Sequence, residues 1–400
     1  MKFDLVFEGG GAKGMVFVGA MQEFENRGHL HDRLLGTSAG AITAALMAAG
    51  YSSQEMLAAL DEKKDGHSVF ADFMGAPSPP NEDDVQKSAI YSLLQNFDAP
   101  WIPNAIENKL DFHIALWLGR QAYGNHLFSF VDRGGWFSAD NFLVWIEKKM
   151  DSGELNGKPR QFSKMTLKQF FKATQKDLSL VASDTTAGQM LVLNHRTAPR
   201  LPVVWAVRMS MSIPLLWQEV VWQTAWGTYL GKKMSGHTIV DGGLLSNFPI
   251  ELFLSDLDTV TRLMGPKQED NVMGLLIDEN MEVKGVSSRS SRASKGIKLG
   301  SLQTVQRLNN LVNTVLGARD KNVIETFEKL VVRMPAKGYG TTEFDMSDSR
   351  KTKLVSAGRE AMKTYLNRIE APEAVPFAIP EVLTRKETAD RMAQNLLAVK

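Results

Sequence analysis

Short apolar runs alternate with amphipathic stretches over the first sixty residues of this 400-residue chain. Apolar runs typical of buried strands occupy Asp4–Phe7 and Arg33–Leu35. Apolar residues recur at helical spacing in three segments, Met15–Arg27, Ala39–Ala49 and Gln54–Glu62. Strands that alternate with helices predict an α/β fold in which a mainly parallel central sheet is sandwiched by helices.

The alternation stops between residues 63 and 160. Proline and acidic residues in Pro77–Asp84 indicate a loop. Helical spacing then recurs in Ser88–Phe97, Ile106–Leu118 and Asn141–Met150. We interpret residues 63–160 as a helical insertion between core strands. A lid or lipid-facing cap and extra helical packing are both open interpretations of this insertion.

Strand patterns return after the insertion. They cover Leu178–Ser183, Met190–Leu193, Thr238–Val240, Val272–Ile277 and Val323–Arg333. Helices are predicted at Leu299–Leu316 and Asp348–Arg368, the second after a loop at Phe344–Ser347. The pattern therefore favours one large domain over residues 1–370, followed by a tail and a polar helix over residues 371–400.

Composition narrows the class of protein. Apolar residues make up 44% and charged residues 23% of the chain, and its formal net charge is +1, so a nucleic acid polymer is not expected as a partner. The lack of cysteine excludes disulfides, thiolate catalysis and zinc–thiolate sites. Charges at Asp4 and Glu8 interrupt any signal-peptide core, and no apolar run reaches the roughly 18 residues of a membrane span. We expect a cytoplasmic protein that meets lipid only at the membrane surface, or a secreted effector without a signal peptide.

The turn around Ser38 carries the clearest chemical signal. Ser38 lies between a predicted strand and the apolar run Ala41–Ala49, within a Gly-x-Ser-x-Gly sequence. Gly36 and Gly40 permit the tight turn of a nucleophile elbow, which projects the serine oxygen at the start of a helix. The pattern predicts that Ser38 is the nucleophile of an acyl hydrolase.

A second glycine-rich turn, Gly9–Gly14, follows the first predicted strand. Its spacing matches the dinucleotide-binding fingerprint, but that fingerprint also requires an acid at the end of the next strand. The only acid of that strand, Asp32, lies at its start, and a phosphate-binding loop is disfavoured because Lys13 precedes a glycine. The turn is also compatible with a plain strand-to-helix connection. As an oxyanion hole, it would supply the backbone amides of Gly9, Gly10 and Gly11.

A serine nucleophile requires a base, and histidine is a poor candidate in this chain. None of the seven histidines follows Asp241 or ends a glycine-flanked strand. Asp241 follows the apolar Ile239–Val240 and precedes two glycines, so it is expected at the carboxyl end of a strand, as Ser38 is. A carboxylate in a dry site can accept a serine proton directly. An ordinary Asp-Gly turn is the alternative.

Three motifs in this order resemble those of the patatin-like phospholipase family: Gly9–Gly14, Gly36–Gly40 and Asp241–Gly243. Three further stretches are similar to family segments, namely Ala182–Gly188, Met209–Pro214 and Phe344–Ser347. The resemblance covers most of residues 1–368 except the insertion.

The resemblance implies a role for each matching residue. It implies that Ser38 is the nucleophile and that Asp241 is its partner and general base. It also implies that Gly10 and Gly11 donate to the oxyanion, with Gly9 completing the loop. Lys13 stands where the family has arginine or lysine, so a phosphate or loop anchor is one interpretation and a solvated surface lysine is the other.

The function implied is a lipid acyl hydrolase of the phospholipase A or lysophospholipase type, which works through a serine–aspartate dyad and an acyl-enzyme. The resemblance implies no cofactor and no metal. Expected partners are a phospholipid or other acyl-ester lipid, the surface of a membrane, and a protein or nucleotide activator, and the chain is compatible with an oligomer. The alternatives are a catalytically silent binding module, against which the intact Ser38 and Asp241 argue, and a dinucleotide-dependent oxidoreductase.

Two segments are candidates for contact with lipid. Leu215–Trp222, with Trp226 and Tyr229, is rich in aromatic residues that favour interfaces, although packing in the core or the wall of an acyl pocket is the favoured interpretation. The segment from Lys284 to Arg307 is basic and would bind anionic headgroups or an acidic activator, unless it is a solvated loop.

Overall fold

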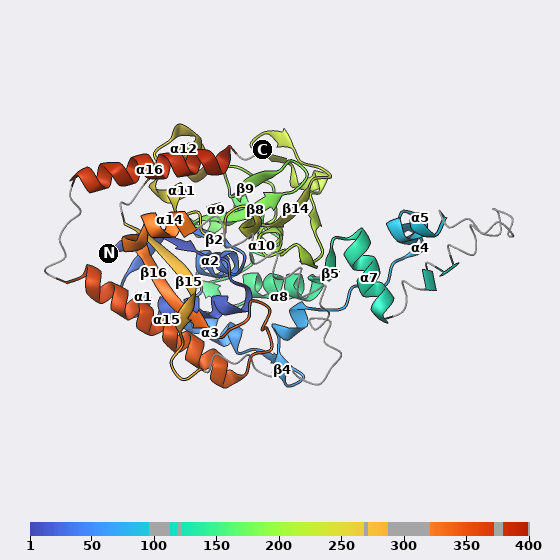
Figure 1. The fold of residues 1–400 in the computed structure, drawn as a ribbon, viewed down its shortest axis with the longest axis horizontal. Coiled ribbons are helices and arrows are strands. Elements are labelled where there is room, and N and C mark those ends of the chain that lie inside the picture. The colour runs from blue at the N-terminus through green and yellow to red at the C-terminus, as the bar shows by residue number, and fades with distance from the viewer. Residues whose placement is uncertain are drawn as a thin grey trace.

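A mixed, mostly parallel sheet lies at the centre of the molecule (Figure 1). The computed structural model describes residues 1–95, 113–114, 116–117, 122–267, 271–286, 321–371 and 379–398. Seven strands follow the order β11-β14-β8-β2-β1-β15-β16, and β9 pairs with β8. Their bounds are β1 Lys2–Phe7, β2 Leu30–Thr37, β8 Asp177–Asp184, β9 Gln189–Leu193, β11 Val220–Val221, β14 Thr238–Asp241, β15 Val272–Glu282 and β16 Val331–Lys337.

The pairing confirms the predicted α/β class. Strands β8, β2, β1, β15 and β16 pair in parallel with their neighbours, whereas β9, β14 and β11 join at one side in antiparallel pairs. Every residue of β8 is buried, as expected for a strand covered on both faces. Because β2 and β8 are parallel, the carboxyl ends of both strands lie at the same edge of the sheet.

Helices cover both faces of the sheet. Alternate residues of β1 pack into two different hydrophobic cores, one on each face. Phe3, Leu5 and Phe7 pack into a core formed with α1, α2, α8, α10 and α15, while Val6 faces a second core formed with α11, α12, α14 and α16. The helix bounds are α1 Val16–Asn26, α2 Ala39–Ala48, α3 Ser53–Leu60, α8 Asp140–Asp151, α9 Leu167–Thr174, α10 Val203–Ser210, α11 Glu251–Leu254, α12 Asp258–Met264, α14 Lys321–Thr326, α15 Asp348–Ile369 and α16 Ile379–Leu397.

Short elements complete the described chain. The 3-10 helices are η1 Gly11–Met15, η2 Ala71–Phe73, η3 Thr224–Trp226, η4 Gly242–Leu244 and η6 Glu328–Leu330. The two-stranded pairs are β3 Lys63–Lys64 with β4 His67–Ser68, β5 Gly135–Phe137 with β10 Leu215–Trp217, β6 Glu154–Leu155 with β7 Lys158–Pro159, and β12 Thr228–Tyr229 with β13 Lys232–Lys233. No helix among the described residues combines the length and the apolar character that crossing a bilayer requires.

The predicted strand Val323–Arg333 is wrong in its first part. Residues Lys321–Thr326 form α14, and the strand β16 begins only at Val331. Val323 and Phe327 both pack into the second core, and their spacing of four residues places them on one side of a helical turn. Burial at this spacing outweighs the strand preference of the β-branched Val323 and Ile324.

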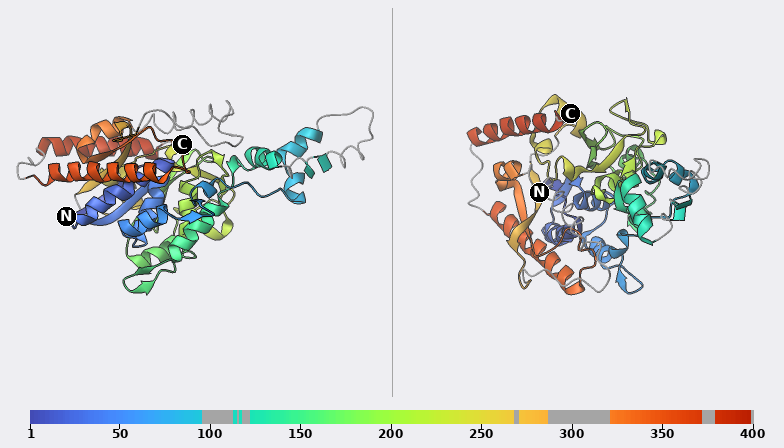
Figure 2. Two further views of the ribbon diagram at one scale, coloured as in Figure 1. Left: turned by 90° about the horizontal axis from the view of Figure 1, so that it is seen from below. Right: turned by 45° about the vertical axis from the view of Figure 1, so that its right-hand side comes forward.

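The insertion at residues 63–160 contains hairpins as well as helices. Its last helix, α8, packs Phe142, Trp145 and Ile146 into the first core. In contrast, α4 (Glu82–Gln86), α5 (Ala89–Gln95) and α7 (Ala122–Asp132) project from the body of the molecule in Figures 1 and 2. Most of the predicted helix Ile106–Leu118 lies outside the described residues. The assignment of the insertion as a lid or cap stays a prediction.

The two candidate lipid-binding segments differ in outcome. Trp217, Trp222, Trp226 and Tyr229 are buried, so packing in the interior is confirmed and the interpretation of these rings as interfacial is wrong. Most of the basic segment lies outside the described residues, including Arg289, Arg292, Lys295, Lys298 and Arg307, and so does the predicted helix Leu299–Leu316.

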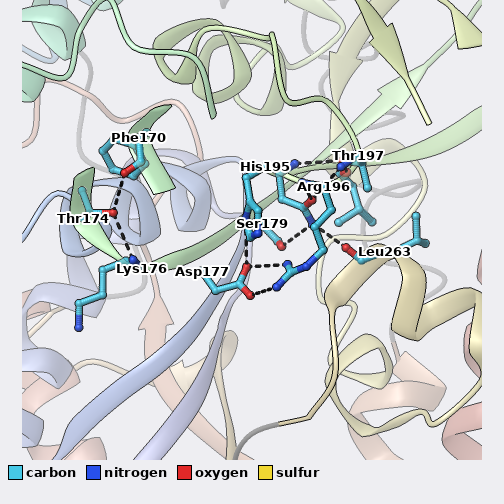
Figure 3. Close-up of polar contacts among 11 residues, drawn as sticks. Phe170, Thr174, Lys176, Asp177, Ser179, His195, Arg196, Thr197 and Leu263 are labelled. Atoms are coloured by element: carbon cyan, nitrogen blue, oxygen red, sulfur yellow. Dashed lines mark hydrogen bonds and ion pairs between the residues drawn. The ribbon is translucent and has the colours of Figure 1, made fainter. Parts of the chain in front are cut away.

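Polar contacts stabilise the amino end of β8, at the edge of the sheet opposite the carboxyl ends of the parallel strands (Figure 3). The Asp177 carboxylate accepts a 2.9 Å hydrogen bond from Arg196 and forms an ion pair with it. Asn194 donates through its amide to Ser179 Oγ at 3.0 Å and to the carbonyl oxygen of Leu263 at 2.8 Å. These contacts fix the start of β8 against the chain that follows β9.

Candidate active site

Ser38 occupies a tight turn between β2 and α2. Its φ is 53° and its ψ is −119°. Residues other than glycine rarely adopt this backbone conformation, which costs on the order of 1–3 kcal/mol. A Cβ atom at Gly36 would clash with the carbonyl oxygen of Gly40, and one at Gly40 would clash with that of Phe7. The tight strand-to-helix turn expected at Ser38 is therefore present, and close backbone contacts require both flanking glycines. Its role as a nucleophile elbow stays a prediction.

Asp241 ends β14 and is 1% exposed. Its Oδ1 accepts a 2.8 Å hydrogen bond from the Gly243 amide, and the Ser38 hydroxyl lies within hydrogen-bonding reach of the carboxyl group. Within the described part of the chain, Oδ2 is buried and accepts no hydrogen bond of ordinary geometry. Burial raises the pKa of Asp241 from 3.8 to about 7, although Ser38 and Gly243 act to lower it. The fold thus brings together two predicted site residues from distant parts of the sequence.

The end of α10 holds both sides of this pair. The Ser38 amide donates to Ser210 Oγ at 3.1 Å, and the Ser210 hydroxyl donates to the carbonyl oxygen of Val181 at 2.6 Å. The Asp241 amide donates to the carbonyl oxygen of Ser212 at 2.9 Å. These contacts explain the proximity of the stretch Met209–Pro214 to both predicted site residues.

The glycine turn Gly9–Gly14 lies beside Ser38. Gly9 is engaged twice by Asn247: its amide donates to the Asn247 carbonyl oxygen at 3.2 Å, and Asn247 Nδ2 donates to the Gly9 carbonyl oxygen at 2.8 Å. The amides of Gly10 and Gly11 donate to no acceptor among the described residues. Gly11 has a φ of +54°, and a Cβ atom there would clash with the Thr341 carbonyl oxygen. Two of the three predicted oxyanion donors therefore remain available to a ligand.

Sequence reasoning missed two residues that support this turn. Glu8 Oε2 accepts a 2.6 Å hydrogen bond from the Ile277 amide, and Glu8 Oε1 accepts a 3.3 Å hydrogen bond from Asn247 Nδ2. Glu8 thereby connects the turn to β15, and Asn247 connects it to the loop that follows Asp241. The only sequence signal for either residue is its position close to one of the glycine motifs.

Lys13 is buried, so its interpretation as a solvated surface lysine is wrong. Its side chain is 3% exposed, and its Nζ forms an ion pair with Glu279 Oε1. Because Lys13 belongs to η1 and Glu279 to β15, the pair joins the glycine turn to the end of a neighbouring strand. This ion pair agrees with an anchor for the loop, and the role of Lys13 as a loop or phosphate anchor stays a prediction.

Two cavities meet at Ser38. The first, which we call the acyl chamber, comprises about 710 Å³ of space, part of it open to solvent. Its lining is almost entirely apolar and includes Leu46, Met56, Ala59, Phe73, Trp145 and Trp217. The second, which we call the polar cleft, comprises about 740 Å³ of space, part of it open to solvent. Its lining includes Glu8, Gly9, Gly10, Gly11, Lys13, Asp241, Asn247 and Glu279. Both cavities share Gly11, Ser38 and Ile213. A molecule with an apolar chain on one side and a polar group on the other fits this arrangement.

Other chemistries find less support. All seven histidines lie among the described residues, and none lines either cavity. His237, the nearest to Asp241 in sequence, binds Asp184 Oδ2 through Nδ1 at 2.8 Å. Among the described residues, no three histidine or acidic side chains gather as a metal site would require. Asp32 lies at the start of β2, away from the glycine turn, and pairs with Lys2 at 3.0 Å, which disfavours a dinucleotide site.

Comparison with known proteins gives one family and several relatives. The model of the family described as patatin-like phospholipase matches residues 5–254. The chain is 26% identical over 375 residues to the uncharacterized protein YqhO of Bacillus subtilis, covering 92% of this chain and 99% of that protein. It is also 24% identical over 121 residues to the probable lipid hydrolase 463L of Invertebrate iridescent virus 6, covering 30% of this chain and 36% of the relative.

Two solved structures show similarity at lower identity. VipD from Legionella pneumophila is 17% identical with a TM-score of 0.42, and the alignment covers 91% of this chain and 66% of VipD. ExoU from Pseudomonas aeruginosa, solved in complex with SpcU, is 16% identical with a TM-score of 0.37, and the alignment covers 98% of this chain and 59% of the matched chain. The chain thus spans about two thirds or less of the length of these solved proteins.

Proposed function

Because this chain belongs to the patatin-like phospholipase family, we propose that it is a lipid acyl hydrolase of the phospholipase A or lysophospholipase type. The observation that carries the proposal is the position of Ser38 beside Asp241, where the acyl chamber meets the polar cleft. The similarity to a viral protein described as a probable lipid hydrolase supports the same class of activity.

The reaction begins with binding of the ester at the junction of the two cavities. The fatty acyl chain enters the acyl chamber, where its burial contributes about 0.8 kcal/mol per methylene group. The ester carbonyl then lies next to Ser38, and the alcohol part of the lipid occupies the polar cleft. This placement brings the carbonyl carbon within reach of the serine oxygen.

Asp241 acts as the general base in the first chemical step. A carboxyl group with a pKa of about 7 is substantially ionised at neutral pH and is far more basic than an exposed aspartate. It takes the proton of the Ser38 hydroxyl as the serine oxygen attacks the carbonyl carbon. The negative charge that develops on the carbonyl oxygen is stabilised by the amides of Gly10 and Gly11, which donate to no acceptor in the described chain.

The tetrahedral intermediate then collapses. The bond between the carbonyl carbon and the alcohol oxygen breaks, Asp241 returns its proton to the leaving alcohol, and an acyl ester of Ser38 remains. A water molecule attacks this ester while Asp241 takes a proton from the water. The fatty acid leaves, and the proton returns from Asp241 to Ser38. The proposed steps use neither a cofactor nor a metal.

The test is covalent labelling of Ser38 combined with an assay of ester hydrolysis. We expect a fluorophosphonate probe to modify the wild-type protein at Ser38, and we expect Ser38→Ala to abolish both labelling and hydrolysis of a lysophospholipid. Ser68→Ala is the matched control, because Ser68 is also buried but lines neither cavity. Full hydrolysis by folded Ser38→Ala would reject the proposal, and a wild-type protein that is neither labelled nor active would favour the silent binding module.

The natural partner under this proposal is a membrane or micelle surface that presents the acyl ester. A protein or nucleotide activator and a cytoplasmic location stay predictions from the sequence, and so does the division between residues 1–370 and 371–400.

A further inference from the structure

The polar cleft has an unusual balance of charge for a site that receives a phospholipid. Its lining includes the carboxylates of Glu8 and Glu279, the ionisable Asp241, and one ammonium group, that of Lys13. The Lys13 ammonium is already paired with Glu279, and its side chain is only 3% exposed. The cleft therefore offers no unpaired cation among its described lining residues. Two glutamates and one lysine give this lining a formal charge of −1, which becomes −2 once Asp241 ionises.

Glu279 is the carboxylate of the cleft most exposed to an incoming ligand. Its side chain is 65% exposed, although it is paired with buried Lys13. In contrast, Glu8 is partly buried and accepts hydrogen bonds from the Ile277 amide and from Asn247. A group that enters the cleft from solvent thus meets the carboxylate of Glu279 rather than the ammonium of Lys13.

The position of the ester fixes which part of a lipid enters the cleft. If the acyl chain fills the acyl chamber and the carbonyl lies at Ser38, the glycerol and headgroup occupy the polar cleft, because the two cavities share Gly11, Ser38 and Ile213 in their described linings. A headgroup with a net negative charge is repelled by Glu279, whereas the ammonium of a zwitterionic headgroup is attracted to it.

We propose that Glu279 is a specificity-determining residue that makes the site prefer neutral and zwitterionic lipid esters over anionic ones. The inference rests on the proposed hydrolase function and deepens it by naming the class of headgroup. Glu279 acts in two ways: its carboxylate repels anionic headgroups, and it pairs with the ammonium group of Lys13, which would otherwise be available to a phosphate.

The experiment compares three esters with the same acyl chain: lysophosphatidylcholine, lysophosphatidylglycerol and a monoacylglycerol. Each is presented in micelles of a neutral detergent at constant ionic strength, so that the surface charge contributes little. For the wild-type protein we expect kcat/KM to be several-fold higher for lysophosphatidylcholine than for lysophosphatidylglycerol. We expect Glu279→Gln to raise the relative rate on lysophosphatidylglycerol by about fivefold, since one unit charge near the headgroup is removed.

Glu282→Gln is the matched control. Glu282 lies on the same strand as Glu279, is 80% exposed, pairs with Lys337 at 3.0 Å, and does not line the cleft. The Glu282→Gln substitution removes the same charge from the protein, and we expect it to leave the ratios of kcat/KM between the three esters unchanged. The monoacylglycerol, which carries no charge, should be hydrolysed at the same rate by the wild-type protein and by Glu282→Gln, and in each protein it is the reference against which the rates on the two phospholipids are expressed.

Several outcomes would overturn the inference. These are a wild-type preference for lysophosphatidylglycerol, an unchanged ratio in Glu279→Gln, an equal change in Glu282→Gln, or hydrolysis of the monoacylglycerol alone. Failure of the wild-type protein to cleave any of the three esters would instead contradict the proposed function itself.

Discussion

Among the individual residues of this protein, Asp241 shows how much a side chain depends on its surroundings. Asp241 is 1% exposed, and one of its carboxylate oxygens accepts no ordinary hydrogen bond within the described chain. No cationic side chain among the described residues acts on its pKa. Burial therefore raises its pKa to about 7, since the charged form loses its hydration without gaining a counter-ion. The same desolvation that makes the carboxylate basic also destabilises the folded protein when the group ionises.

This cost predicts a pH-dependent effect of Asp241→Asn. Between about pH 4 and pH 7 the folded protein keeps a proton that the unfolded chain has released, so the contribution of this group to stability falls as pH rises through that window. Asparagine does not ionise. We expect the free energy of unfolding of the variant, relative to wild type, to increase from pH 4.5 to pH 8 by at most about 4 kcal/mol.

The measurement is denaturant unfolding of both proteins at the two pH values. The shared change in all other titrating groups cancels in the difference between the two proteins. A difference that stays the same at pH 4.5 and pH 8 would show that Asp241 ionises in the folded state much as it does in water. The variant should also lose ester hydrolysis, because an amide does not accept the Ser38 proton.

At the scale of helices and strands, three helices contribute side chains to the wall of the acyl chamber beside Ser38. Helix α2 contributes Ile42 and Leu46, α3 contributes Met56 and Ala59, and α8 contributes Trp145. Helices α3 and α8 turn an apolar side inward and polar residues outward, whereas α2 is apolar and buried along almost its whole length. The chamber is therefore a property of how the helices pack, and the small side chain of Ala59 leaves room within it.

We predict that Ala59→Leu shortens the acyl chain that the protein accepts. The larger side chain fills part of the chamber, so hydrolysis of a long-chain ester should fall about tenfold relative to a butyryl ester, with a stability loss on the order of 1–3 kcal/mol. The readout is kcat/KM over a series of esters with increasing chain length. Ala58→Leu is the control, because Ala58 is the neighbouring residue of α3 and is exposed. An unchanged chain-length profile in a folded Ala59→Leu protein would mean that the acyl chain binds elsewhere.

At the scale of the whole molecule, the last helix completes the second core. In Figure 1, α16 lies along α11. It packs into the second core, whereas α15, which precedes it in sequence, packs into the first. Ala389, Ala393 and Leu396 of α16 are buried in that core. Asp390 adds polar contacts, since it accepts hydrogen bonds from Ser255 Oγ at 2.6 Å and from the Asp256 amide at 2.9 Å.

This packing predicts that Ala393→Glu destabilises the protein by several kcal/mol, because the substitution places an unpaired charge in an apolar contact. Thermal unfolding followed by circular dichroism measures the effect. Gln394→Glu adds the same charge on the exposed side of the same helix and should change the midpoint little. Equal melting temperatures for the two variants would indicate that α16 contributes no core packing in solution.

Local patterns in the sequence were sufficient for much of the fold and for the identity of the candidate site. The strand-turn-helix sequence around Ser38 and the strand that ends at Asp241 depend on nearest neighbours along the chain, so they could be predicted residue by residue. The choice between strand and helix at Val323 could not, because both fit a short apolar run and only contact with the second core favours the helix.

The sequence by itself determined which groups are available: a serine and a carboxylate at the ends of strands, glycines whose backbone amides no side chain of their own covers, and no cysteine. Only the tertiary structure decided how those groups behave. It buried Asp241 and thereby raised its pKa, paired Lys13 with Glu279, and joined Gly9 to Asn247. The physical reason is that backbone conformation follows largely from local sequence, whereas hydration, charge pairing and cavity shape depend on residues that meet only after the chain has folded.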